Sequence, residues 1–241
     1  MLSLIVAAVL CAQAPQGPQA PPAAPILTKM FGRYMQAKSL VGQITQTATV
    51  NGRQAKYVTV VEYERPYLLY IRTTGKDKEW ITSATGTQIC YHVPNDKPST
   101  HVTQLGESQL TDSGTKTIGD VYVIASQSQG DKSLPLDLVI ANTGDLVKMR
   151  DHWATIANSG KSTVNGVTVN RITGGWRPAV RAAVCAQFEL DVTDEGDLVR
   201  YAMTQDLRIE NVPDIQHIVI VWDCDLKVDA KPDASLFKVY K

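Results

Sequence analysis

The feature that most constrains this chain is a change of hydrophobic period at about Leu40. From there to about Thr103, apolar and polar residues alternate in short segments that are separated by turn signals such as Asn51-Gly52. Alternation with period two is typical of half-buried β-strands, and Asn-Gly is a strong signal for a two-residue hairpin. The stretch therefore predicts an antiparallel meander of at least five strands.

An Arg-Pro dipeptide interrupts this meander. The segment "VEYERPYLLYIRTTG" (residues 61–75) places Arg65-Pro66 between two β-like stretches. Proline has no backbone N–H to give to a ladder, so it belongs at a strand start, an edge or a bulge. We therefore expect Pro66 to separate two strands or to bend one sharply. The strand before it would carry Tyr57, Thr59, Val61 and Tyr63 on one face, and Val58, Val60, Glu62 and Glu64 on the other.

Helical spacing precedes and interrupts the β pattern. Pro25 suits the first position of a helix, and apolar residues then recur at helical spacing at Ile26, Leu27, Met30, Phe31, Tyr34 and Met35. A second helical region is expected near 117–158, with two short helices interrupted near Gly130 and a third in "DLVKMRDHWATIANSG". Beyond it the β pattern returns for about four or five strands.

This order favours one domain over two, spanning 26–241 with the helical insertion inside it. The expected fold class is α+β, with a curved antiparallel sheet capped by helices. A sheet this long tends to curl. If it curls without closing, helices must cover its concave face, and an incompletely packed apolar cavity would remain beneath them.

The N-terminus has the pattern of a secretory signal peptide. Residues 2–10 form a run that is apolar apart from Ser3, too short to span a bilayer, which needs about 20 residues. The small-residue site Ala12-Gln13-Ala14 follows, so we expect a signal peptide over 1–14 and export to the periplasm or cell envelope. The alternative is a short buried segment. Residues 15–25 hold five prolines and are expected to form a linker.

The cysteines leave two questions open. Cys11 suggests a lipid anchor, but Leu10 precedes it where a lipobox requires a small residue, so no anchor is expected. The other three are Cys90, Cys185 and Cys224, an odd number that cannot pair completely. Either Cys185 and Cys224 form one bridge, or all three are buried thiols.

The sequence offers no catalytic or metal-binding motif. The histidines His92, His101, His152 and His217 are scattered, and HExxH, GxSxG, GxGxxG and P-loop patterns are absent. We therefore expect no enzyme, no metal and no cofactor, although a hydrolase assembled from distant residues stays an alternative. Lys plus Arg and Asp plus Glu both number 24, and this balance gives no support to a nucleic-acid partner.

Aromatic side chains gather in the meander, at Tyr63, Tyr67, Tyr70, Trp80 and Tyr91. Aromatic and apolar residues with few polar groups are what a hydrophobic ligand pocket requires. An ordinary core would use the same residues, and the pattern alone does not separate the two.

The order of several weak motifs resembles the LolA/LolB-like superfamily of periplasmic lipoprotein carriers. The motifs are "QAKSLVGQITQT" after the first helix, the Arg-Pro junction in "VEYERPYLLYIR", the hairpin "WITSATGTQICYHVPNDKPSTHV", the strand "VNGVTVNRI" and the closing "DASLFKV". They extend thinly over residues 26–241. The helical insertion is most similar to an uncharacterised branch of the superfamily.

The resemblance implies an incomplete β-barrel closed by helices and a non-enzymatic, monomeric carrier of lipid or lipoprotein acyl chains. The expected ligand-binding residues are Phe31, Met35, Tyr63, Tyr70 and Trp80. Arg65 matches the family's Arg-Pro arginine, which contributes to ligand exchange, although it could equally be a rim charge. Typical carriers continue beyond the last strand, whereas this sequence stops at Lys241, so delivery to a membrane receptor is not implied. The alternative is an envelope sensor that binds a protein partner.

Overall fold

The computed structural model describes residues 22–76, 78–93, 99–104, 117–129, 134–140, 153–176, 183–208 and 214–240. The predicted signal peptide, Cys11 and most of the predicted linker lie outside these residues.

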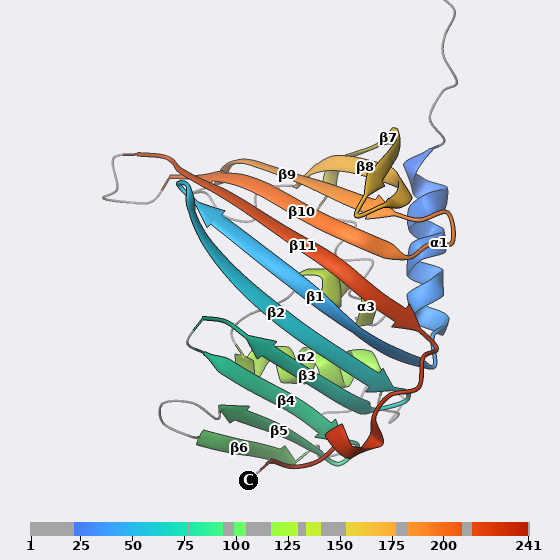
Figure 1. Ribbon diagram of the computed structural model, residues 1–241, viewed down its shortest axis with the longest axis vertical. Coiled ribbons are helices and arrows are strands. Elements are labelled where there is room, and N and C mark those ends of the chain that lie inside the picture. Colours follow the sequence, from blue (N-terminus) through green and yellow to red (C-terminus); the bar gives the residue numbers. More distant parts are fainter. Residues whose placement is uncertain are drawn as a thin grey trace, which may run out of the picture.

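The described residues form one curved, antiparallel sheet of 11 strands with helices on one side (Figure 1). The strand order is β6-β5-β4-β3-β2-β1-β11-β10-β9-β8-β7, so β1 and β11 join two meanders at the centre and β6 and β7 form the edges. The sheet does not close into a barrel, and the predicted fold class is confirmed. The first meander consists of β1 (Ser39–Val50), β2 (Arg53–Glu64), β3 (Leu68–Thr74), β4 (Glu79–Thr85), β5 (Gln88–Val93) and β6 (Ser99–Gln104). The second consists of β7 (Trp153–Val164), β8 (Val167–Trp176), β9 (Ala183–Val192), β10 (Leu198–Leu207) and β11 (Gln216–Val228).

Two Asn-Gly turns close hairpins in this sheet. Asn51 and Gly52 have φ of 47° and 80° between β1 and β2, and Asn165 and Gly166 have φ of 50° and 80° between β7 and β8. Positive φ at both central residues suits the right-handed twist of the flanking strands.

The prediction of a third helix in residues 145–160 is wrong for the described part, residues 153–160, because β7 begins at Trp153. The second half of that stretch, "WATIANSG", is rich in residues with low helix propensity. The Asn-Gly turn that follows pairs it with β8 instead.

Pro66 separates two strands, as predicted. β2 ends at Glu64, β3 begins at Leu68, and the Arg65-Pro66 peptide bond is cis. The two faces of β2 also follow the predicted alternation. Thr59, Val61 and Tyr63 are buried, whereas Val58 and Val60 are half-buried and Glu64 is exposed.

Three helices cover the face of the sheet that carries Val61 and Tyr63, here called the helix-covered face. They are α1 (Ala23–Gln36), α2 (Ile118–Gln129) and α3 (Leu134–Ile140). α1 begins two residues before Pro25 and buries Leu27, Met30, Phe31 and Tyr34. These side chains form one core cluster with residues of α2, α3 and both meanders. No helix of the described residues is long and apolar enough to cross a membrane.

The opposite, outer face is partly covered by the C-terminal segment (residues 229–240), which crosses β3–β5 on the side turned to the viewer in Figure 1. The hydroxyl of Ser83 donates to the carbonyl oxygen of Lys238, and the thiol of Cys90 lies 3.6 Å from the carbonyl oxygen of Tyr240. The ring of Tyr240 stacks on His92, with centroids 5.9 Å apart.

Cys224 is a free thiol, so the bridge to Cys185 that the sequence left open is not formed. The strand register explains why. Cys224 pairs with Ile44 on β1, whereas Cys185 pairs with Asp206 near the far end of β10. The two backbone positions therefore lie on strands that are not neighbours and at different levels along the sheet.

Candidate ligand-binding face

Alternate residues of the central strands make one continuous apolar surface on the helix-covered face. β11 contributes Ile218, Ile220, Trp222, Cys224, Leu226 and Val228 to it, and its intervening residues include His217, Asp223, Asp225 and Lys227. Successive side chains of a strand point to opposite faces. The two faces of β11 therefore differ in chemistry, and the apolar one lies toward the helices.

Near α1, this surface is fully packed. Leu40 and Ile44 of β1 and Tyr201 of β10 are at most 1% exposed, and they belong to the same core cluster as Met30 and Tyr34 of α1. The hydroxyl of Tyr34 accepts a 3.0 Å hydrogen bond from the amide of Leu198. This end of the surface is an ordinary core.

Away from α1, the same surface is not fully covered. We call this region the open patch, and it consists of Ala48, Val50, Met203, Ile218 and Ile220. The register places Ala48 beside Ile220 and Ile220 beside Met203, with Val50 beside Ile218 in the next row. Val50 is 41% exposed and the other four are half-buried. The open patch is thus a direct continuation of the core that lacks its full cover.

Three aromatic side chains mark the boundary between the packed core and the open patch. Phe188 meets Tyr201 edge-on with centroids 6.5 Å apart, and Tyr201 lies 5.3 Å from Trp222. Trp222 Nε1 donates a 3.0 Å hydrogen bond to Oε1 of Gln46, so the polar edge of the indole is satisfied. All three rings are buried. They form a rigid apolar wall at the inner limit of the patch.

The outer face behind the open patch mixes polar and apolar residues. On the helix-covered face, one row of paired residues consists of Ala48, Ile220, Met203 and Phe188. Their neighbours along the same strands point to the outer face and form the row Thr47, Val221, Ala202 and Glu189. A hollow of about 380 Å³ lies there over β7–β10, but threonines, Gln187 and Glu189 dominate its lining. Such a lining does not suit an acyl chain.

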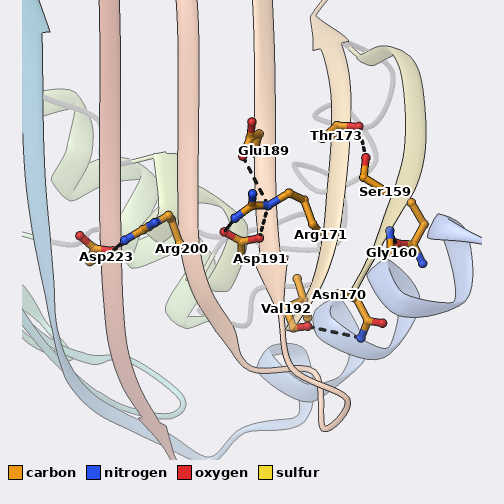
Figure 2. Close-up of polar contacts among 11 residues, drawn as sticks. Ser159, Gly160, Asn170, Arg171, Thr173, Glu189, Asp191, Val192, Arg200 and Asp223 are labelled. Carbon is orange, nitrogen blue, oxygen red and sulfur yellow. Dashed lines mark hydrogen bonds and ion pairs between the residues drawn. The ribbon is translucent and has the colours of Figure 1, made fainter. Parts of the chain in front are cut away.

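Ion pairs occupy the outer face next to this hollow (Figure 2). The guanidinium of Arg171 contacts both carboxylate oxygens of Asp191, at 2.8 and 3.1 Å, and Glu189 lies 3.5 Å away. The hydrogen bond to Asp191 is the main reason that the pKa of Arg171 is raised. Arg200 pairs with Asp223 on the neighbouring strands at 2.7 Å. On the outer face, charge pairs therefore link β8 to β9 and β10 to β11 in addition to the backbone pairing of these strands.

Two of the predicted site residues, Phe31 and Tyr63, lie together in the core cluster. They are 7% and 0% exposed, so neither meets solvent. Burial raises the pKa of Tyr63, and the nearby charge of Arg65 opposes that shift. Tyr63 lies on the helix-covered face and Phe31 on α1 above it, and contact of either residue with a ligand stays a prediction.

Arg65 lies at the C-terminal end of α1. Its Nε donates a 2.6 Å hydrogen bond to the carbonyl oxygen of Ala37, and its guanidinium carbon lies 5.8 Å from the ring centroid of Tyr63. The side chain is thus engaged with the helix and with an aromatic face rather than extended from the rim.

The other three predicted site residues are dispersed. Tyr70 lies on the outer face, where it pairs with Glu62 and Ser83 and contacts Tyr240 of the C-terminal segment, and its contact with a ligand stays a prediction. Trp80 is half-buried on the helix-covered face, 6.3 Å from the ring of Tyr57. Met35 is 39% exposed and lies outside the core cluster.

The sequence analysis missed the open patch, although a signal for it was present. In the segment "QHIVIVWDCDLKV" (residues 216–228), every even-numbered residue after Gln216 is apolar. The polar residues after Gln216 all have odd numbers. That alternation identifies one apolar face. It does not show which part of the face is left uncovered, since this depends on how distant segments pack against it.

No group of His, Cys, Asp and Glu side chains suited to a metal ion occurs within the described ranges.

Comparison with known proteins gives similarity in structure only. No family model matches the sequence, and no curated protein does. The chain is similar to the solved structure of lipoprotein LppX from Mycobacterium tuberculosis, at 12% identity and a TM-score of 0.45, over 88% of this chain and 98% of that one. It is also similar to a LolA superfamily protein from Nitrosomonas europaea, at 11% identity and a TM-score of 0.34, over 91% and 99% of the two chains.

A third similar structure is the MucA/MucB complex of Pseudomonas aeruginosa, at 14% identity and a TM-score of 0.44. The match covers 90% of this chain and 61% of that chain, so this chain spans less than two thirds of it. At these identities and TM-scores, no functional role carries over to this chain.

Proposed function

We propose that this protein binds the acyl chains of a lipid or lipoprotein on the open patch and carries them through the cell envelope. The observation behind the proposal is the half-buried apolar row of Ala48, Ile220 and Met203, which continues the hydrophobic core without its full cover. Apolar surface left in water is costly, and a contiguous area of it on a soluble fold is characteristic of a binding site. An acyl chain needs no polar partner, and the patch offers none.

The energetics favour a chain of several methylenes. Each CH₂ removed from water contributes about 0.8 kcal/mol, about a fourfold gain in binding. Five methylenes packed against Ile218, Ile220 and Met203 would contribute about 4 kcal/mol before the costs of association. The wall formed by Phe188 and Trp222 would limit how far the chain reaches toward α1. A fluorescent fatty-acid probe is therefore a suitable first ligand.

The test compares substitutions at neighbouring positions of one strand. Ile220→Asp places a carboxylate in the open patch, whereas Val221→Asp places it on the outer face of the same strand, and both wild-type residues are half-buried. We expect Ile220→Asp to lower affinity for a fluorescent fatty acid at least tenfold, because a charge would have to be buried under the chain. Val221→Asp should bind as wild type does.

The cargo is identified by purifying the wild-type protein from the envelope without detergent and analysing the bound lipid by mass spectrometry. Stoichiometric acyl lipid that is lost in Ile220→Asp supports the proposal and names the cargo class. A folded, lipid-free protein with equal probe affinity in both variants would contradict the proposal. In that case the envelope sensor becomes the better hypothesis, and a stable protein partner on pull-down would identify it.

A further inference from the structure

A cluster of basic side chains lies at the end of the sheet where β2 begins and β3 ends. It comprises Arg53, Lys56, Arg72, Lys76 and Lys78, all of them exposed. Glu79 lies beside the cluster and pairs with Arg72, whereas the other described acidic residues of β2–β4, Glu62 and Glu64, lie toward the opposite end of β2. The turn sequence Lys76-Asp77-Lys78 adds one further acid, which lies outside the described residues.

An open hollow of about 670 Å³ lies beside part of this cluster on the outer face. Val58 and Val60 contribute apolar surface to its lining, and Lys56, Arg72 and Lys76 contribute positive charge. Within the described residues, Lys56 and Lys76 have no ion-pair partner. The chain as a whole has a formal net charge of zero. The positive charge here is therefore a local feature and does not come from a basic protein.

Exposed aliphatic side chains lie at the same end of the sheet. Val50 is 41% exposed at the end of β1, and Ile215 is 45% exposed just before β11. The two segments meet at the β1–β2 turn, where the amide of Asn51 donates a 3.1 Å hydrogen bond to the carbonyl oxygen of His217. In Figure 1 this end is at the left, opposite α1. Basic side chains together with exposed aliphatic ones are typical of surfaces that lie at a membrane interface.

We propose that this end of the sheet docks on an anionic phospholipid bilayer. Lysine and arginine near such a surface are attracted by its negative potential, which acts over about 10 Å at 0.1 M salt. Val50 and Ile215 would enter the headgroup layer beside the lysines. Because Val50 also belongs to the open patch, docking would hold the uncovered end of the helix-covered face at the membrane. The docking itself requires no bound cargo and is independent of the proposed carrier function.

The test is co-sedimentation of the full chain with two kinds of vesicle. One is phosphatidylcholine alone, and the other is phosphatidylcholine with one-third phosphatidylglycerol. The apolar stretch of residues 2–10 would add the same affinity for both, so the readout is the ratio of the two partition coefficients. We expect that ratio to be well above one at low salt and to fall toward one at about 0.5 M salt, where the screening length is only a few ångströms.

Two double variants with equal net charge separate the site from the rest of the surface. Lys56→Gln/Lys76→Gln removes two charges from the cluster. Lys227→Gln/Lys231→Gln removes two exposed lysines at the far end of β11. Each lysine near an anionic surface is worth about fivefold in partitioning, so the first variant should lose about 25-fold on anionic vesicles. The second should remain within about twofold of wild type.

Each outcome of the vesicle experiment either supports the docking proposal or overturns it. Preferential binding to anionic vesicles that is lost only in Lys56→Gln/Lys76→Gln supports the proposal. Equal binding to both vesicles, or equal losses in the two variants, overturns it. A protein that ignores vesicles but loses an acidic protein partner in Lys56→Gln/Lys76→Gln overturns it too. Matching thermal melts of the variants exclude unfolding as the cause.

Discussion

The guanidinium of Arg65 binds the carbonyl oxygen of Ala37, the residue that follows the last residue of α1, through a 2.6 Å hydrogen bond from Nε. A second bond of 3.3 Å runs from Nη2 to the carbonyl oxygen of Tyr34. The last carbonyls of a helix have no partner inside the helix, and a positive charge there is favourable. Arg65 thus joins the end of α1 to the junction between β2 and β3.

Replacing Arg65 with Ala should lower the free energy of unfolding by about 1.5 kcal/mol, because hydrogen bonds to a charged group are lost from a half-buried site. Arg65→Lys should fall between wild type and Ala, since one ammonium replaces two donors. Urea unfolding measures both values. Arg53→Ala, at the exposed β1–β2 turn, is the control and should change little. An unfolding free energy of Arg65→Ala equal to wild type would assign Arg65 to the rim, without a structural role.

The C-terminal segment should protect the thiol of Cys90 from alkylation. Cys90 is 1% exposed, and its sulfur lies 3.6 Å from the carbonyl oxygen of Tyr240. Tyr240→Ala removes the ring that stacks on His92, so we expect the segment to detach more often and Cys90 to react at least several times faster. Mass spectrometry of iodoacetamide-treated peptides reports each cysteine separately. Cys224, on the other face of the sheet, is the internal control, and unchanged Cys90 labelling would contradict the prediction.

Most of the local structure could be predicted because it depends on neighbours in sequence. The alternation of Val61 and Tyr63 with Val60 and Glu62 fixed which residues share a face, and Pro66 fixed where one strand ends. These features follow from backbone geometry alone. The helix-covered face of β2 was therefore predictable before the position of any helix was known.

The placement of Tyr70 was not predictable in this way. The sequence analysis expects it among the ligand-binding residues, whereas it lies on the outer face and is only 5% exposed. The cover comes from Tyr240, which lies 170 residues later in the chain and reaches β3 only because β11 pairs with β1. When so distant a segment buries a residue, the neighbouring sequence does not indicate that burial. The same reasoning applies to the open patch, since segments distant in sequence determine how much of that face is covered.

The ion pair of Arg171 and Asp191 should be asymmetric in its response to mutation. The side chain of Asp191 is 0% exposed, whereas that of Arg171 is 31% exposed. Arg171→Met leaves a buried carboxylate without its partner and should cost about 3 kcal/mol of unfolding free energy. Asp191→Asn keeps the shape and a hydrogen-bond acceptor, while Arg171 still reaches water and Glu189, so about 1 kcal/mol is expected. Equal costs in urea unfolding would show that Asp191 is reached by solvent.

Stability should fall steeply above pH 10 because buried tyrosines resist ionisation in the folded protein. Burial raises the pKa of Tyr34 above its usual value of 10.0, against the lowering effect of the Leu198 amide. Above pH 10.0 the unfolded state loses a proton that the folded state keeps, so the stability that Tyr34 contributes is complete below this pH and is lost as pH rises. One such group contributes a slope approaching about 1.4 kcal/mol per pH unit.

Tyr34→Phe tests this slope directly. The variant loses the acceptor for the Leu198 amide and should be less stable at pH 7. Above pH 10, however, its unfolding free energy should decline less steeply than that of wild type, by up to about 1.4 kcal/mol per pH unit. The decline should not vanish, because burial also raises the pKa of Tyr122, and that of Tyr240 to about 12. Parallel curves for the two proteins would mean that Tyr34 ionises in the folded state as readily as in the unfolded one.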